Sequence, residues 1–371
     1  MSWKQNKDKF NEKKIVLIGA FPPPYGGISI HIQRLHRYLL GKGYKCYVIS
    51  PFYGHDKRRQ VPNLSYLPKK TAWIQFLILF YKLLILRGAI RHYHVSSMGN
   101  FAKGGWLTMF IPGKNVVTIH SGSFVGNMQK LPRIKRTILY WALLKANKLI
   151  AVNKKIWNYC EDIRIPTNKM LLQPAFLKPF MEDQQELDDK LIQKVERLRK
   201  SREKLFILSG LPCPLYGIDK FFKALSTIKE KKFGVVVIFY SPIKQLQNQF
   251  YKYKEELDCT INSFGEVVVL ANDVNNDTFI KIISICDIYV RPTATDGDSV
   301  TVREALALRC QVLASSVSHR PEGCALFDIE RIDLFTELLS RSLDDSSIGL
   351  AIKGFEEDGF LPLASLFDEL M

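Results

Sequence analysis

The sequence predicts two Rossmann-like α/β domains, each built around a parallel β-sheet with helices on both faces. Short apolar runs alternate with stretches of helical periodicity, as parallel sheets require. This alternation pauses over a charged stretch without strand patterns at 180–203, and it restarts at residue 204. The 371 residues suffice for two or three domains. The composition, with 47% hydrophobic and 24% charged residues, excludes a disordered or collagen-like chain.

In the first half, an apolar run at 14–19 predicts a strand that ends at a proline-rich turn. A helix follows, because Ile28, Ile32, Leu35 and Leu39 share one face before two glycines stop it. Further strands are expected at 46–49, 91–96, 115–120, 147–152 and 169–172.

In the second half, strands are expected at 204–209, 234–240, 264–270, 285–290 and 311–314, with helices at 218–230, 243–257, 276–285 and 300–308. We therefore place the first domain at 1–178, a linker with a surface helix at 179–203, and the second domain at 204–345. The C-terminal segment, 346–371, is long enough to pack back on the first domain.

The apolar stretch 72–86 is too short to span a bilayer, which needs about 20 residues. The favoured interpretation is a buried helix of the first domain. The alternative is a helix at a membrane interface, with Trp73, Phe76, Phe80 and Lys82 as contacts.

The net charge of +17 is unevenly distributed, with +25 in residues 1–180 and −8 in residues 181–371. A basic half suits an anionic membrane, a nucleic acid or a phosphorylated substrate. Seven cysteines without C-x-x-C spacing argue against a zinc or disulfide framework, and the polar N-terminus has no signal-peptide pattern. We expect a cytoplasmic protein.

Gly26 and Gly27 lie between the first strand and its helix, where backbone amides can face an anion. His120 ends the strand at 115–120, and the carboxyl ends of parallel strands face ligands. His92 and His94 alternate on the preceding strand and could suggest a metal. No third ligand has suitable spacing, so we interpret both as structural.

The stretch 287–310 joins a strand, a polar loop and a helix, and it places Asp296 and Glu304 eight residues apart. Carboxylates there suit the hydroxyls of a sugar or ribose. Asp296, Gly297 and Asp298 also form a D-x-D tripeptide, which is equally typical of a turn with a helix cap.

These motifs, in this order, resemble the bacterial GT-B glycosyltransferases of the large retaining family 4. The resemblance rests on Pro-Pro-Pro-Tyr-Gly-Gly-Ile, Thr-Ile-His, and Arg-Pro-Thr…Asp-Gly-Asp-Ser-Val…Arg-Glu-Ala-Leu. It implies two Rossmann-like domains facing each other across a cleft, with the acceptor on the first and a nucleotide sugar on the second. It also implies that no metal cofactor is needed.

The resemblance further implies roles for single residues. His120 would lie at the reacting sugar, Asp296 would contact sugar hydroxyls, and Glu304 would hold the ribose. The donor and its phosphates would be bound by Gly26, Gly27, Gly210, Asp298, Ser299 and Val300.

The chain departs from the family where the second domain begins. The family has Gly-Arg-x-x-x-x-Lys-Gly, whose Arg and Lys neutralise the diphosphate, but Leu211 and Tyr216 occupy those two positions here. Losing one such donor costs roughly 10²–10³ in rate. Arg291 is the favoured replacement, and Arg320 ranks second.

The sequence thus predicts an enzyme that transfers a hexosyl unit from a nucleoside-diphosphate sugar, with retention, to a saccharide acceptor carried on a lipid. It would serve surface polysaccharide synthesis as a peripheral protein on the inner membrane face. An inactive partner of another transferase and a nucleotide-sugar epimerase are the alternatives. A nucleic-acid-binding protein ranks last, and no nucleic-acid partner is expected.

Overall fold

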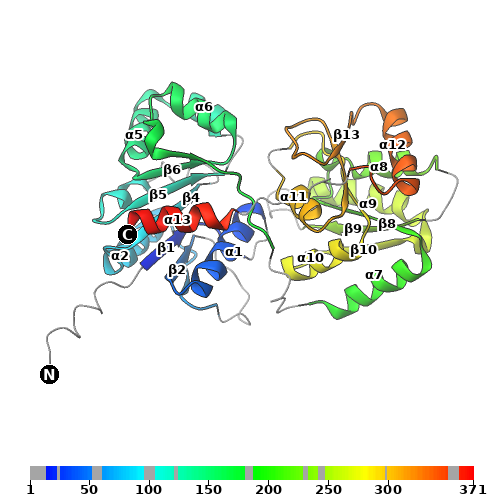
Figure 1. Ribbon diagram of the computed structural model, residues 1–371, viewed down its shortest axis with the longest axis horizontal. Helices are drawn as coiled ribbons and strands as arrows, with labels where there is room; N and C mark the ends of the chain where they lie inside the picture. Colours follow the sequence, from blue (N-terminus) through cyan, green and yellow to red (C-terminus); the bar gives the residue numbers. More distant parts are fainter. Residues whose placement is uncertain are drawn as a thin grey trace. The chain divides into compact units, whose positions relative to one another are not determined.

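The computed structural model divides into two compact units (Figure 1). The first unit comprises residues 1–177 and 358–371, and the second comprises 178–357. The structure describes residues 14–22, 26–51, 61–95, 105–120, 124–179, 187–228, 233–240, 247–296, 299–349 and 359–371.

The first unit is built on a seven-stranded parallel sheet in the order β3-β2-β1-β4-β5-β6-β7. Its strands are β1 (Lys14–Ile18), β2 (Lys45–Ser50), β3 (Leu64–Tyr66), β4 (Ile90–Val95), β5 (Asn115–Ile119), β6 (Lys148–Ala151) and β7 (Met170–Leu172). All residues of β4 and β5 are buried, as expected for strands covered on both faces. The strand order reverses between β1 and β4, so ligands are expected at the carboxyl ends of these strands.

The helices of the first unit are α1 (Gly27–Gly41), α2 (Ala72–Ile85), α4 (Phe124–Lys130), α5 (Arg133–Lys145), α6 (Lys154–Asp162) and α13 (Phe360–Leu370), with short 3₁₀ turns η2 (Gly105–Phe110) and η3 (Thr167–Lys169). The last helix, α13, belongs to this unit although it follows the whole second unit, and it contacts α1 (Figure 1). Phe360 stacks on Tyr38 of α1, and Tyr44 donates a hydrogen bond to Asp368.

The expectation that residues 72–86 form a buried helix is wrong. In α2 only Leu83 is buried, while Trp73, Leu77 and Tyr81 are 70%, 58% and 65% exposed. The polar residues face inward instead: Gln75 donates to the Pro68 carbonyl, and Lys82 donates to Ser65 Oγ. Helix α2 thus packs on the core through Leu83 and the half-buried Ile78, Leu79 and Phe80, and its other side exposes further apolar side chains to solvent.

The second unit has a six-stranded parallel sheet in the order β10-β9-β8-β11-β12-β13. Its strands are β8 (Lys204–Gly210), β9 (Phe233–Phe239), β10 (Val268–Asn272), β11 (Ile288–Arg291), β12 (Gln311–Ser315) and β13 (Ala325–Phe327). The order reverses between β8 and β11, which places Gly210 and Arg291 at the expected ligand edge.

The helices of the second unit are α7 (Asp189–Ser201), α8 (Ile218–Leu225), α9 (Gln247–Asn262), α10 (Asn276–Ile285), α11 (Val300–Ala307) and α12 (Ile332–Asp344), with turns η4 (Pro214–Tyr216) and η6 (Gly265–Val267). Helix α7 falls in the stretch 179–203, which was expected to form a linker with a surface helix; it packs against α10 and lies within this unit. Its buried face is formed by Leu191, Ile192, Val195 and Leu198.

The predicted fold class of two parallel-sheet α/β domains is confirmed. Two three-residue strands at sheet edges, β3 and β13, were not expected from the sequence. No helix within the described ranges is both long and apolar enough to cross a bilayer.

Candidate active site

Arg291, Asp296 and Arg320 form a tight ionic group at the carboxyl end of β11. Arg291 Nε donates to Asp296 Oδ2 at 3.0 Å, and its Nη2 donates to Oδ1 at 3.2 Å. Arg320 Nη1 donates to the same Oδ2 at 2.8 Å. One carboxylate therefore holds two guanidinium groups, and the group keeps a net positive charge.

Further hydrogen bonds hold Arg320 in place. Its Nε donates to the Ser315 carbonyl at 3.1 Å, and its Nη2 donates to Thr293 Oγ1 at 3.3 Å. The side chain of Arg320 is only 1% exposed, whereas those of Arg291 and Asp296 are 12% and 11% exposed. Arg291 and Asp296 thus retain some solvent access, while Arg320 is enclosed.

Asp296 stays ionised in this setting. Burial acts to raise the pKa of its carboxyl, but the guanidinium groups of Arg291 and Arg320 outweigh burial and lower that pKa below its usual range. Because the carboxylate accepts from both arginines, we expect it to fix their orientation.

Tyr216 lies where the resembling family has its lysine, and its ring lies beneath Arg291. The guanidinium carbon of Arg291 is 5.0 Å from the centre of that ring, within cation–π range. The ring also covers Gly210: a Cβ at Gly210 would come within 2.0 Å of Tyr216 Cδ1. The cation near position 216 is thus supplied by Arg291, a connection that sequence spacing alone could not show.

The loop holding Tyr216 is fixed at its next residue. Gly217 has φ +62°, and a Cβ there would lie 1.8 Å from the Pro292 carbonyl oxygen. Only glycine fits this close approach between the loop and the chain that follows β11. Leu211, at the family's arginine position, is half-buried.

Glu304 lies in α11, and Ser299 is the residue that precedes this helix. Glu304 is 1% exposed, and Ser299, the residue before the first turn, is 8% exposed. Val300 opens the helix and is half-buried. Gly297 and Asp298 lie outside the described residues. The expected ribose contact of Glu304 remains a prediction, and so does the donor contact of Ser299 and Val300.

Gly26 and Gly27 lie at the start of α1 in the first unit, and both are exposed. The Gly26 amide donates to Ser29 Oγ, whose hydroxyl donates back to the Gly26 carbonyl. A Cβ at Gly26 would meet no described atom within 4 Å, so packing does not require glycine there.

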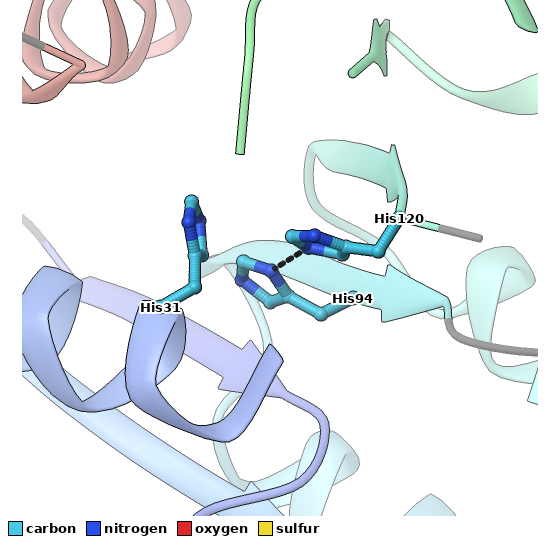
Figure 2. Close-up of side chains that lie close together, drawn as sticks. All are labelled: His31, His94 and His120. Carbon is cyan, nitrogen blue, oxygen red and sulfur yellow. Dashed lines mark hydrogen bonds between the residues drawn. The ribbon is translucent and has the colours of Figure 1, made fainter. Parts of the chain in front are cut away.

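His120 follows β5 and lies against two other histidines, His94 from β4 and His31 from α1. Figure 2 shows the three rings facing one another. His94 Nδ1 and His120 Nε2 are 3.0 Å apart and share a hydrogen bond. No third ligand has a suitable sequence spacing from the histidines of β4. In space, however, His31 and His120 both lie close to His94. Since β4 and β5 pair in register, with His94 opposite Thr118, adjacent strands bring the rings together.

Burial keeps these imidazoles neutral. It lowers the pKa of His31 from 6.5 to about 4, although a hydrogen bond to the Ala175 carbonyl partly opposes the shift. Burial also lowers the pKa of His94 and His120 well below 6.5, and neighbouring imidazoles add to the effect. At neutral pH the group therefore offers uncharged donors and acceptors.

The fold is shared with glycosyltransferases of known structure. Alignment with a glycosyltransferase from Rickettsia africae covers 97% of this chain and 99% of that one, with 16% identity and a TM-score of 0.68. A sucrose-phosphate synthase from Thermosynechococcus elongatus gives 14% identity, 96% and 95% coverage, and a TM-score of 0.66. The chain has a GT-B fold.

Anabaena HepE in complex with UDP also aligns, with 12% identity, coverage of 96% and 100%, and a TM-score of 0.66. In addition, residues 25–174 match the model of Glycosyltransferase Family 4. The family match and the fold together support a glycosyltransferase. Among curated proteins, none matches this sequence.

Proposed function

We propose that this GT-B protein transfers a hexosyl unit from a nucleoside-diphosphate sugar to a saccharide on a lipid carrier, with retention of anomeric configuration, in surface polysaccharide synthesis. The bond from the sugar's anomeric carbon to the diphosphate breaks, and a bond to an acceptor hydroxyl oxygen forms. The hydroxyl proton leaves with the diphosphate. The diphosphate gains negative charge, so a fixed cation beside it lowers the barrier.

The arrangement of Arg291 carries this proposal. Its guanidinium lies over Tyr216, at the end of a central strand and next to the switch in strand order. Asp296 holds it by two hydrogen bonds, so little reorganisation is needed when charge develops. Arg291 would thereby replace the missing basic pair. Asp296 would position Arg291 through these bonds, and its expected contact with sugar hydroxyls stays a prediction.

The other roles follow the resemblance and remain part of the proposal. Glu304, from α11, would hold the ribose hydroxyls, and the amides around Ser299 would face the donor. His120, uncharged in its buried cluster, would hydrogen-bond the reacting sugar.

A catalytically inactive partner subunit is the second candidate. It is favoured by Leu211 and Tyr216, which remove both basic side chains of the family's motif, and by the Tyr216 ring that covers Gly210. An epimerase would differ from both because it would convert a nucleotide sugar without any acceptor.

Nucleotide binding is the first test. We expect one nucleoside diphosphate or its sugar to raise the melting temperature of the full chain, since a bound ligand stabilises by mass action. Arg291→Met should weaken binding measured by calorimetry roughly 10–100-fold, consistent with losing a charged hydrogen-bond partner of about 1.5–3 kcal/mol. Glu304→Ala should also weaken it.

The matched control is Arg331→Met, which removes an exposed arginine of the same unit paired with Asp333. Its affinity should equal that of the unchanged chain. If no nucleotide binds, the inactive subunit is the better interpretation. If the nucleotide sugar is converted to another nucleotide sugar without any acceptor, the epimerase is the better interpretation.

We also infer that the first unit binds an anionic membrane through α2, η2 and α5, placing the enzyme on the inner face of the cell membrane. Helices α2 and α5 both contact η2. Exposed apolar side chains extend over all three: Trp73, Leu77 and Tyr81 on α2, Phe110 on η2, and Ile134 and Trp141 on α5. We call these six the apolar surface.

Basic residues are concentrated in the same part of the sequence as the apolar surface. Residues 57–160 contain 18 Lys or Arg and no Asp or Glu. Exposed Arg133, Lys135 and Arg136 follow one another along α5, and Lys145 lies 4.9 Å from the centre of the Phe110 ring. Aromatic anchors flanked by cations are typical of interfacial helices. Of the membrane contacts expected from the sequence, Trp73 belongs to this surface, whereas Phe76 and Phe80 are half-buried and Lys82 is bonded to Ser65.

Vesicle sedimentation tests the membrane contact. The full chain should bind vesicles containing anionic lipid, bind zwitterionic vesicles more weakly, and dissociate as salt rises. Trp73→Glu with Trp141→Glu should abolish binding. Tyr251→Glu, at a 59% exposed aromatic residue of α9, should leave it intact. Binding indifferent to both salt and lipid charge would contradict the proposal, and tight nucleic-acid binding at physiological salt would favour that partner instead.

A further inference from the structure

The three-histidine cluster of the first unit has a composition that its surroundings do not explain. His31, His94 and His120 come from α1, β4 and the end of β5, and each offers one nitrogen within 4.8 Å of the others (Figure 2). No carboxylate belongs to this group. Burying an imidazole costs free energy unless its nitrogens find hydrogen-bond partners or a metal inside the protein. A buried group of three imidazoles therefore requires an explanation.

Two of the rings leave a nitrogen without a hydrogen-bond partner. His31 Nε2 and His94 Nε2 are both buried and unpaired among the described atoms. His31 and His94 are only 5% and 7% exposed. His36 Nε2 and His92 Nδ1 are also unpaired among the described atoms, so the unpaired nitrogens of His31 and His94 point to a ligand only together with the close approach of the three rings.

One contact orients His31 as a metal ligand is oriented. His31 Nδ1 lies 2.7 Å from the Ala175 carbonyl oxygen, which can only accept, so Nδ1 carries the proton. The unpaired Nε2 of His31 therefore carries the lone pair. Histidine ligands of metals commonly donate their other ring nitrogen to a carbonyl in this way.

We propose that His31, His94 and His120 bind one divalent transition-metal ion of the zinc type. Three imidazoles with a fourth position left for water or an oxyanion match the composition of open zinc sites. In a tetrahedral site, with bonds of about 2.05 Å, ligand nitrogens lie about 3.3 Å apart. The three nitrogens of this cluster lie within 4.8 Å of one another, so ligation requires them to approach by no more than about 1.5 Å, and the hydrogen bond between His94 and His120 must give way to the two metal bonds.

The chemistry of the cluster also selects the ion. Imidazole suits zinc, cobalt, nickel and copper, whereas magnesium and calcium prefer oxygen ligands. His92 lies next to His94, with ring centres 4.0 Å apart, but its Nε2 is bonded to Thr118 Oγ1 at 2.6 Å. Its Nδ1 is also buried without a partner among the described atoms, but His92 is not one of the three histidines whose nitrogens lie within 4.8 Å of one another, so it is not included as a ligand.

Cobalt titration of the metal-stripped full chain tests the proposal. Tetrahedral Co²⁺ absorbs visible light strongly, so binding can be followed directly and its stoichiometry measured. A Cys259→Ser background removes the exposed thiol that could bind metal by itself. We expect one Co²⁺ per chain, displaced by Zn²⁺ and not by Mg²⁺.

The variants His31→Gln and His94→Gln should each weaken Co²⁺ binding more than tenfold. The matched control is His36→Gln, because His36 is equally buried on the same helix but lies outside the cluster. Zn²⁺ should also raise the melting temperature of the control and not of the two cluster variants. If a cluster variant fails to fold, His120→Gln at the half-buried strand end replaces it.

Absence of stoichiometric binding to the folded unchanged chain would overturn the proposal. So would binding that survives in the cluster variants, or that is lost equally in His36→Gln. None of these measurements uses a sugar or nucleotide, so failure of metal binding is distinguishable from failure of the proposed transfer reaction, although both proposals give a role to His120.

Discussion

At the residue scale, the candidate site of the second unit shows how a missing charge is replaced from a distant part of the chain. Arg291 follows Tyr216 by 75 residues, yet its guanidinium lies over the Tyr216 ring because β8 and β11 are neighbouring strands. Sequence reasoning could rank Arg291 and Arg320 as replacements. It could not predict that Asp296 would bind both, since this depends on side-chain geometry.

The histidine cluster was harder to find for a related reason. His31, His94 and His120 are far apart in sequence and follow no metal-ligand spacing. A signal existed in the predicted topology: parallel strands β4 and β5 end at the same edge, so His94 and His120 had to be neighbours. The position of His31 depends on how α1 packs.

Acid should destabilise the first unit through His31. Its pKa is about 4 when folded and 6.5 in an exposed histidine, so the unfolded chain binds the proton more tightly. The stabilising contribution is complete above 6.5 and is lost as pH falls toward 4. At about pH 5 the loss from His31 alone is about 2 kcal/mol.

Urea unfolding at about pH 7.5 and about pH 5, with a chelator present, measures this loss. The unchanged chain should lose more stability between the two than His31→Gln does, by about 2 kcal/mol. Equal losses in both chains would contradict the burial of a neutral His31.

At the element scale, most strands could be predicted because apolar runs in a doubly covered parallel sheet are nearly continuous. The run at 115–120 became β5, and that at 234–240 became β9. The edge strands β3 and β13 have only three residues each, too few for a pattern. Helix α2 misled because it is apolar on nearly all sides, which indicates burial, whereas only the side that carries Leu83 packs on the core and the other side is exposed.

The orientation of α2 leads to a contrast between two leucines of the same helix. Leu83→Ala should cost about 2–5 kcal/mol, because Leu83 is fully buried. Leu77→Ala should change stability by less than about 0.5 kcal/mol, because Leu77 is 58% exposed. Thermal or urea unfolding of the two variants measures the difference. Similar losses would mean that α2 packs by another face.

At the scale of the whole molecule, the last residues of the chain complete the first unit rather than the second. Phe360, Leu363 and Phe367 are buried within it, and Gln173 donates to the Gly359 carbonyl. Lys148 and Glu369 form an ion pair at 2.9 Å. From the sequence, the segment 346–371 was long enough to pack back on the first domain, but its length alone could not show which residues it would contact.

Deleting residues 359–371 should therefore weaken the first unit selectively. Hydrogen exchange should accelerate in α1 and β4 while peptides of β8 and β9 keep their protection, because local stability follows local packing. Substituting exposed Leu361, which is 60% exposed, with Ser is the control and should alter neither region. Equal acceleration in both units would show that the two unfold as one.

The return of α13 also sets an order of events during synthesis. A chain emerging from the ribosome usually folds its N-terminal domain first, at about 5–20 residues per second. Here the first unit waits for residues 359–371, so roughly 10–40 s separate the translation of Leu177 from that of its final helix. The second unit, begun later, is finished sooner. During this interval the apolar face that α13 will cover stays open to chaperones, and the nascent protein completes its oldest part last.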